Sequence, residues 1–321
     1  MNYLENDGVT GGSRGPARTG VREHVRPSVT RAEEVVTNAS GENFPVALRV
    51  LPRRYRRHLT NLYVFARLTD DLGDQARDDQ ASDDQARDDG QEDVTTLRLA
   101  LLDELAADVD RIYAGSTPSS PVMQAMAETV IHCHVPAQPL RDLIQANRQD
   151  QQVTRYRTFA GLEQYCELSA NPVGQVVLYI FGAATPERLG LSDRICTALQ
   201  LAEHWQDVAE DLALGRIYLP AEDMQKHAVT EADLARPSAG PNLKQLMRFE
   251  VDRAARLLDE GAPLVGTLRG AARLAVAGYL AGGRAALAAI RQQDYDVLST
   301  QSKPAKPRMA AELALAYARG R

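Results

Sequence analysis

The sequence predicts an all-α protein that folds as a single domain. Apolar residues recur at helical spacing along most of the chain, whereas the strict alternation typical of strands is scarce. Aromatic residues make up 5% of the chain, and alanine and leucine dominate its later segments. With 321 residues, 44% of them hydrophobic, the chain is long enough to bury one large core. Together these observations favour a helical bundle.

The N-terminal part of the chain contains two segments that are poor in apolar residues. Residues 1–40 are rich in glycine, arginine, threonine and glutamate and lack periodicity, so we expect a disordered tail. The folded domain is expected to span residues 41–298. Its first helix is predicted at Phe44–Asp74, with Pro52 suited to a first helical turn. Residues 75–93 are near-repeats of Asp-Gln-Ala-Arg-Asp, which indicate a solvated acidic insertion.

Helical spacing continues through the rest of the domain, and joints at Pro118, Pro186 and Pro237 fall between the predicted helices. Residues 299–321 are expected to form a C-terminal tail with one short helix rich in alanine and leucine. The remaining helices are predicted at Thr95–Tyr113, Pro121–His132, Gln138–Arg148, Gly161–Phe181, Ser192–Leu214, Asn242–Asp259 and Ala262–Arg291.

Charge and cysteine content exclude several classes of function. The net charge of -6 and pI near 5.6 argue against a nucleic-acid partner, which would require clustered lysine and arginine. Three cysteines without a C-x-x-C pair indicate neither a disulfide framework nor a thiolate zinc site. The N-terminus lacks the features of a signal peptide, and no stretch reaches the roughly 18 apolar residues of a membrane span. We therefore expect a cytoplasmic protein, and peripheral contact with the inner face of a membrane stays open.

The first predicted helix carries a stripe of polar residues. Tyr63, Arg67, Asp70 and Asp74 are spaced four, three and four residues apart. At about 100° per residue, these side chains project from one side of a helix. The apolar residues between them project elsewhere and can pack, so the carboxylates are free to face a cavity. Asp71 lies about 100° away from Asp70 and is expected to orient a neighbour or meet solvent.

A second stripe lies on the helix predicted at Ser192–Leu214. It consists of Gln200, His204, Asp207 and Asp211, with Glu203 at its edge. Each of the two helices thus carries an Asp-x-x-x-Asp pair, and carboxylates one turn apart repel each other unless a cation lies between them. Magnesium prefers oxygen ligands and is commonly held by one or two carboxylates together with phosphate oxygens. The pattern predicts a magnesium and diphosphate site, although a solvated acidic helix face would give the same spacing.

Both stripes resemble the motifs of the squalene/phytoene synthase family, an all-α family of isoprenoid synthases whose helices surround a central cavity. The matching runs are Leu62-Tyr63 with Ala66-Arg67-Leu68-Thr69-Asp70-Asp71-Leu72-Gly73-Asp74, and Trp205-Gln206-Asp207-Val208-Ala209-Glu210-Asp211 followed by Gly215-Arg216-Ile217-Tyr218-Leu219-Pro220. Within the family, Glu42-Asn43-Phe44-Pro45-Val46, Ser169-Ala170-Asn171-Pro172-Val173-Gly174 and Ala198-Leu199-Gln200-Leu201 look most like the hydroxysqualene synthases of the hopanoid pathway.

This resemblance implies a role for each matching residue. Two or three magnesium ions would be held by Asp70, Asp74, Asp207 and Asp211. The catalytic residues would be Tyr63, Arg67, Tyr165 and Tyr279. The rings of Phe44, Tyr63, Tyr165 and Tyr279 would line the pocket of a carbocation. The substrate would be bound by Phe44, Arg67, Asn171, Gln200, Glu203, Arg216 and Tyr218, with both arginines neutralising diphosphate charge.

Four positions depart from the family pattern. Glu203 stands where many members have asparagine, Gln206 where they have arginine, and Glu42-Asn43 where condensing members have Ser-Lys. These changes remove positive charge near the phosphate site, and no G-x-G-x-x-G follows a predicted strand to suggest a nicotinamide site. The expected reaction is therefore conversion of presqualene diphosphate to hydroxysqualene, with water as the nucleophile.

Two alternatives stay open. One is head-to-head prenyl transfer, which would join two farnesyl or geranylgeranyl diphosphates. The other is a non-catalytic helical scaffold or assembly factor, which would have no reason to retain carboxylates on inward faces. As partners, the resemblance suggests the prenyl diphosphate substrate and neighbouring enzymes of the same pathway.

Overall fold

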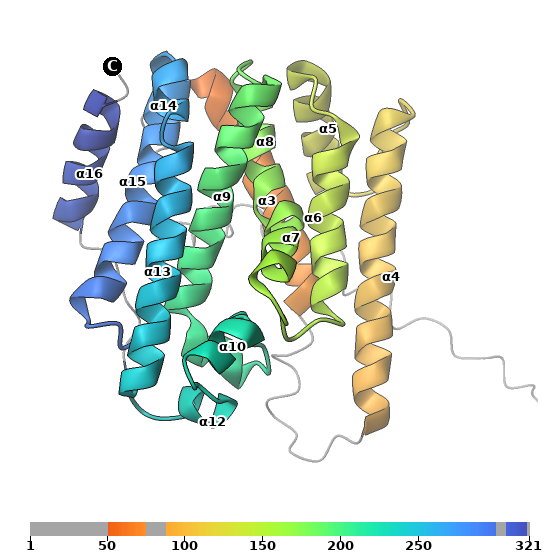
Figure 1. Ribbon diagram of the computed structural model, residues 1–321. Helices are drawn as coiled ribbons and strands as arrows, with labels where there is room; N and C mark the ends of the chain where they lie inside the picture. Colours follow the sequence, from red (N-terminus) through yellow and green to blue (C-terminus); the bar gives the residue numbers. More distant parts are fainter. Residues whose placement is uncertain (1–50, 75–87, 300–305, 320–321) are drawn as a thin grey trace, which may run out of the picture.

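The computed structural model describes residues 51–74, 88–299 and 306–319, and all of the regular elements in these ranges are helices (Figure 1). The predicted all-α fold class is therefore confirmed. The tail expected at 1–40, Phe44 and residues 75–87 of the expected insertion lie outside the described residues. The helices are α3 (Arg53–Asp74), α4 (Asp88–Tyr113), α5 (Pro121–Cys133), α6 (Ala137–Asp150), α7 (Phe159–Ser169), α8 (Asn171–Ile180), α9 (Pro186–Gln206), α10 (Val208–Ala213), α11 (Ala221–Lys226), α12 (Glu231–Leu234), α13 (Pro241–Gly261), α14 (Leu264–Thr267), α15 (Gly270–Gln292) and α16 (Lys306–Arg319).

Local signals in the sequence explain where several of these helices begin. Thr158 caps α7, because its hydroxyl oxygen accepts a hydrogen bond from the Gly161 backbone N–H at 3.1 Å. Thr185 caps α9 in the same way through Arg188 N–H at 3.3 Å, and Pro186 follows as the first helical residue. Helix α9 consequently starts six residues before the predicted Ser192.

Three of the predicted helices are divided in the structure. The one predicted at Gly161–Phe181 is split at Ala170 into α7 and α8, and Pro172 near the start of α8 cannot donate a backbone hydrogen bond. The helix predicted at Ser192–Leu214 is interrupted at Asp207, which separates α9 from α10. The helix predicted at Ala262–Arg291 becomes α14 and α15, and Gly270, the first residue of α15, has a φ of 56°.

The start of α4 and two short helices also differ from the prediction. Helix α4 begins at Asp88, inside the acidic tract, and not at Thr95. The short helices α11 and α12 were not predicted, because four to six residues are too few for a periodic pattern. Helix α16 matches the short helix expected in the C-terminal tail, and it packs on the domain through the buried side chain of Ala316.

Two clusters of buried apolar side chains hold the helices together. One is built mainly by α7, α9, α13 and α15 and contains Trp205, which is fully buried. The other is built mainly by α3, α4, α5 and α6 and contains Phe65, also fully buried. Helix α8 contributes to both, with Leu178 in the first cluster and Val176 in the second. Because they share this helix, the two clusters form one continuous body.

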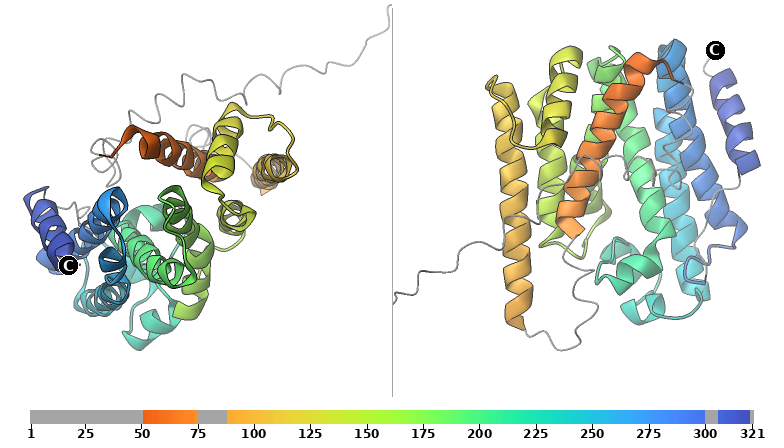
Figure 2. Two further views of the ribbon diagram at one scale, coloured as in Figure 1. Left: turned by 90° about the horizontal axis from the view of Figure 1, so that it is seen from above. Right: turned by 180° about the vertical axis from the view of Figure 1, so that it is seen from behind.

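The long helices stand side by side, with α4 at one edge of the molecule and α16 at the other (Figures 1 and 2). Helices α3 and α9 end near the same end of the bundle, where α10 and α12 lie across it (Figure 1). The two helices predicted to carry aspartates therefore bring their C-terminal turns into one region. In the part of the chain that the structure describes, no helix has the length and apolar character needed to cross a membrane.

Candidate functional site

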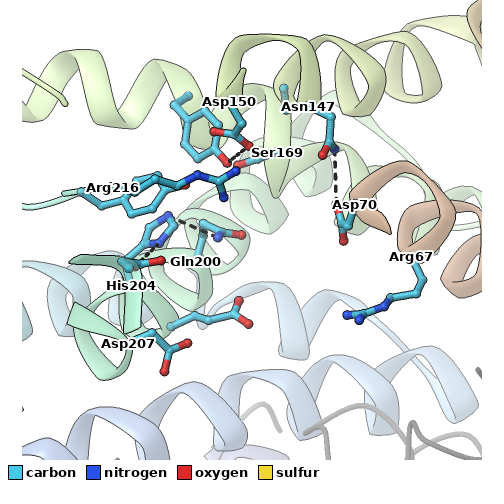
Figure 3. Close-up of a pocket in the computed structure, with 14 residues that line it drawn as sticks. Arg67, Asp70, Asn147, Asp150, Ser169, Gln200, His204, Asp207 and Arg216 are labelled. Atoms are coloured by element: carbon cyan, nitrogen blue, oxygen red, sulfur yellow. Dashed lines mark hydrogen bonds and ion pairs between the residues drawn. The ribbon is translucent and has the colours of Figure 1, made fainter. Parts of the chain in front are cut away.

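A polar cavity of about 280 Å³ opens among the ends of α3, α6, α7 and α9 and the segment that follows α10 (Figure 3). Its walls carry acidic, basic and aromatic side chains, and they come from stretches more than 70 residues apart in the sequence. The residues that line it are Arg67, Asp70, Ala146, Asn147, Asp150, Tyr165, Ser169, Gln200, Glu203, His204, Asp207, Asp211, Arg216 and Tyr218.

Helix α3 supplies one wall through Arg67 and Asp70. The Asn147 side-chain amide donates a hydrogen bond to Asp70 Oδ1 at 3.2 Å, so α6 helps to hold this carboxylate (Figure 3). Arg67 Nε lies 3.0 Å from Asp71 Oδ1, one turn further along α3. Asp71 thus orients a neighbour, while the side chain of Asp74 lies outside the described residues.

The opposite wall is formed where α9 ends and α10 begins. Asp207 occupies the break, with backbone angles φ -107° and ψ 17° that are not helical. Its N–H still bonds to the Glu203 carbonyl at 3.0 Å, and its own carbonyl accepts from Asp211 N–H at 2.8 Å. Asp207 and Asp211 both face the cavity, with Trp205 buried behind them. The break therefore re-aims the chain, while these two backbone hydrogen bonds join Asp207 to the helix on each side.

A glycine turn after α10 places Arg216 in the cavity. Gly215 has a φ of 76°, which glycine adopts at little cost. The Gly215 N–H bonds to the Leu212 carbonyl at 2.9 Å and the Arg216 N–H to the Asp211 carbonyl at 2.8 Å, which is the Schellman arrangement of a helix end. Arg216 is 9% exposed, and its guanidinium points toward Asp150 and Ser169 (Figure 3). Asp211 and Arg216 are thus parts of one rigid turn.

Buried aromatic rings cover the inner end of the cavity. The imidazole of His204 stacks on the Tyr218 ring with centroids 3.7 Å apart, and Tyr165 lies 5.8 Å from Tyr218. His204 Nδ1 is 3.8 Å from Asp211 Oδ2, and its Nε2 is 3.3 Å from the Gln200 amide nitrogen. His204 therefore links an aromatic wall to the acidic one.

The two tyrosine hydroxyls of this wall are hydrogen-bond donors at neutral pH. Burial raises the pKa of Tyr165 well above its usual value, and the nearby Asp150 carboxylate raises it further. The pKa of Tyr218 is raised for the same two reasons. The Tyr165 hydroxyl donates to Asp150 Oδ2 at 2.7 Å. Neither tyrosine can serve as a strong base, but both can orient a ligand.

The cavity carries an excess of negative charge that suits a divalent cation. Five carboxylates line it, from Asp70, Asp150, Glu203, Asp207 and Asp211, against the two guanidinium groups of Arg67 and Arg216. Among the described residues, no three acidic, histidine or cysteine side chains converge on one point. The donors are oxygens spread over two walls, as fits magnesium that keeps its waters and shares phosphate oxygens.

The structure brings most of the predicted site residues to this cavity. Tyr63, Asn171 and Tyr279 do not line it. Tyr63 lies two turns before Asp70, about 10 Å along the helix. Asn171 is buried and accepts a hydrogen bond from the Thr197 hydroxyl at 3.0 Å, joining α8 to α9. Tyr279 packs with the apolar cluster of α3–α6, where burial raises its pKa.

The residues that sequence reasoning missed come from α6 and α7: Ala146, Asn147, Asp150 and Ser169. The predicted helix ended at Arg148, two residues before Asp150, so this carboxylate had no helical neighbour to align with. Asn147 and Asp150 are three residues apart and share a helix face, which was the available signal.

The fold and the site together define a class of protein, namely an all-helical bundle with an acidic cavity that has aromatic walls. A family model described as squalene/phytoene synthase matches residues 37–310. A hydroxysqualene synthase from Zymomonas mobilis is 31% identical over 221 residues, which cover 68% of this chain and 67% of that protein. A phytoene synthase from Arthrospira platensis is 28% identical over 296 residues, covering 87% of this chain and 90% of that protein.

Solved structures agree with these relatives. The crystal structure of squalene synthase HpnC from Alicyclobacillus acidocaldarius is 39% identical and matches with a TM-score of 0.70, over 82% of this chain and 94% of that one. A dehydrosqualene synthase structure, 23% identical, shares the fold with a TM-score of 0.75, over 90% of this chain and 95% of that one. The chain belongs to the squalene/phytoene synthase family, whose enzymes act on prenyl diphosphates. The expected membership of the squalene/phytoene synthase family is thereby confirmed.

Proposed function

We propose that this protein converts presqualene diphosphate to hydroxysqualene and diphosphate in a magnesium-dependent reaction. The observation that carries the proposal is the pairing, across one cavity, of Asp70 on α3 with Asp207 and Asp211 at the α9–α10 break. The 31% identity to a hydroxysqualene synthase and the 39% identity to squalene synthase HpnC support this branch of the family.

The acidic and the basic residues of the cavity would have different roles. Asp70, Asp207 and Asp211 would hold magnesium, with Asp74 as a further ligand carried over from the motif. Bound magnesium supplies positive charge that stabilises departing diphosphate. Arg67 and Arg216 face the same space and neutralise the remaining phosphate charge, which grows as the carbon–oxygen bond breaks.

The aromatic wall is suited to the cation that remains after diphosphate departs. The buried rings of Tyr165 and Tyr218 present polarisable faces in a place that solvent hardly reaches. The rearranged cation is then captured by water, whose oxygen forms the new bond and whose proton is released. The Asp150 carboxylate, already an acceptor for the Tyr165 hydroxyl at 2.7 Å, is a candidate to orient that water.

Head-to-head prenyl transfer is the second candidate, because phytoene synthases match this chain at 28% identity over nearly its whole length. Both reactions would use the same carboxylates. Head-to-head transfer uses two diphosphates and therefore requires more positive charge in the cavity than a reaction of one. Glu203 instead adds a negative charge to this cavity, which favours the first candidate.

The test is incubation of the purified protein with magnesium and either presqualene diphosphate or farnesyl diphosphate, with the products identified by mass spectrometry. We expect an alcohol from presqualene diphosphate and no turnover when magnesium is chelated. Carbon–carbon joining of farnesyl diphosphate would select the second candidate. No turnover of either substrate, with magnesium binding intact, would favour the non-catalytic scaffold.

A further inference from the structure

We propose that Arg155 is a positioning residue, which fixes the glycine turn that aims Arg216 into the cavity. Arg155 does not line the cavity and lies on the segment between α6 and α7. Its guanidinium nevertheless joins three separate parts of the chain. The inference rests on the proposed function to the extent that Arg216 is taken to bind diphosphate.

The contacts of Arg155 use its planar fork of donors. Nη1 donates to the Gly215 carbonyl at 2.7 Å and to the Thr154 carbonyl at 2.9 Å. Nε and Nη2 donate to the two carboxylate oxygens of Glu231, at 2.9 and 3.0 Å. Glu231 is the first residue of α12, so this bidentate pair holds the guanidinium in one orientation. The third nitrogen, Nη1, is thereby directed at the Gly215 and Thr154 carbonyls.

The Gly215 carbonyl is a sensitive point in the chain. Gly215 adopts a φ of 76°, and its N–H and that of Arg216 are held by the backbone bonds of the helix end. The Gly215 carbonyl, in contrast, is held by the Arg155 side chain. The next residue is Arg216, and its guanidinium lies at the far end of a long side chain. A small rotation at Gly215 therefore moves the charged group by a larger distance inside the cavity.

Neighbouring backbone contacts show that Arg155 belongs to a longer brace. Ile217 N–H bonds to the Thr154 carbonyl at 2.9 Å, and Ala221 N–H bonds to the Tyr156 carbonyl at 2.9 Å. These bonds hold residues 217–221 against residues 154–156, on the far side of Arg216. Among the described residues 154–156, only Arg155 contacts Gly215 through its side chain. Arg155 thus holds the residue before Arg216, and the backbone bonds hold the residues after it.

The solvent exposure of Arg155 distinguishes a positioning role from a general contribution to stability. Its side chain is 40% exposed and that of Glu231 58% exposed, and ion pairs this open to solvent add little to stability. The pair Arg291–Asp252 is a close match, with a distance of 2.9 Å and exposures of 40% and 50%, on the outer faces of α15 and α13. Arg291→Ala is therefore the control.

The experiment measures binding of inorganic pyrophosphate in the presence of magnesium by isothermal titration calorimetry. The proteins compared are the wild type, Arg155→Ala, Arg155→Lys, Arg216→Ala, the Arg155→Ala/Arg216→Ala double variant and Arg291→Ala. We expect Arg155→Ala to weaken binding about tenfold, because a displaced charge loses most of its alignment with the phosphate. Arg155→Lys should give an intermediate affinity, since lysine can reach one acceptor but cannot form the fork.

The double variant provides the decisive comparison. If Arg155 acts through Arg216, the double variant binds no more weakly than Arg216→Ala alone. Additive losses, or an unchanged affinity in Arg155→Ala while Arg216→Ala binds weakly, would overturn the inference. An unchanged affinity in Arg216→Ala would instead count against the proposed diphosphate site. Should Arg155→Ala fail to fold, Glu231→Gln removes the same fork and is judged by the same two comparisons.

Discussion

At the scale of single residues, the cavity depends on carboxylates that face each other from different helices. Asp70 is held by the Asn147 amide, and Asp207 is held by the backbone of the helix break. Like charges gathered in this way repel, and a divalent cation with its phosphate ligands offsets that repulsion.

Replacing either of these aspartates should abolish turnover. In Asp70→Asn and Asp207→Asn the side chain keeps its shape but loses its charge, so we expect activity to fall at least about 100-fold, with helix content by circular dichroism unchanged. Asp71→Asn is the matched control on α3. It pairs with Arg67 at 3.0 Å and should lose only a few-fold. Full activity in Asp70→Asn or Asp207→Asn would contradict the metal assignment.

The residue scale also shows what the sequence could predict about the site. Arg67, Asp70, Asp207 and Asp211 could be found because helical spacing places them on polar stripes. Asn147 and Asp150 share a helix face but were missed, because their roles depend on contacts with Asp70 on α3 and Tyr165 on α7. Tyr279 was expected at the pocket, yet it packs among apolar residues, since an aromatic ring fits either environment equally well.

At the scale of elements, the helices were predicted more reliably than their interruptions. The apolar stripe of α9 continues into α10 with Leu201, Trp205, Val208 and Leu212, so the periodicity gives no sign of the break at Asp207. The split between α7 and α8 had a visible cause in Pro172, but proline near a helix start and proline at a kink look alike in sequence. Tertiary packing decides between them.

The pairing of α13 with α9 tests this packing. Helix α13 approaches α9 at Gly261, where an added Cβ would lie 2.6 Å from Ile195 Cγ1 and 2.8 Å from the Leu191 carbonyl oxygen. Because a backbone atom cannot move aside cheaply, we expect Gly261→Ala to lower the free energy of unfolding by about 1–3 kcal/mol.

The control for this substitution is Gly190→Ala, on α9, the helix that Gly261 packs against. Gly190 is exposed, and an added Cβ would meet nothing within 4 Å. There alanine should raise stability by roughly 0.5–1 kcal/mol through helix propensity alone. Urea unfolding curves of the two variants give the comparison. Equal stabilities would show that the α9–α13 contact tolerates a methyl group.

At the scale of the whole molecule, a buried charge cluster joins the small helices at the end of the bundle to the long ones. Arg253 on α13 donates to Asp223 on α11 at 2.8 Å and to Glu250 at 3.0 Å. Glu250 is fully buried, and Arg253 also lies 3.9 Å from the Phe159 ring centroid. Two acids thus share one cation. Burial, assisted by the Asp223 charge, raises the pKa of Glu250 to about 8 despite Arg253.

This cluster predicts a specific dependence of stability on pH. Folded Glu250 keeps its proton up to about pH 8, whereas an unfolded glutamate releases it near 4.5. The folded state therefore binds more protons between these values, and the free energy of unfolding falls as pH rises through the window. The contribution of Glu250 is complete below pH 4.5 and lost above pH 8.

Glu250→Gln isolates this effect, because glutamine has nearly the same shape and does not titrate. Melting temperatures of the wild type and the variant should be measured between pH 5 and pH 9. We expect the wild type to lose more stability than the variant as pH rises. Parallel melting curves across the range would mean that Glu250 is already ionised in the folded protein.

The burial of Trp205 has a practical consequence. It is the single tryptophan of the chain, its ring is inaccessible to solvent, and it lies two residues before Asp207. Its indole N–H has no hydrogen-bond partner among the described residues, so the ring is held by apolar neighbours alone. Selective excitation of indole therefore yields emission from one known position, next to the helix break. Any tightening of that break by magnesium and pyrophosphate would change the emission, which makes this residue a built-in optical reporter of ligand binding.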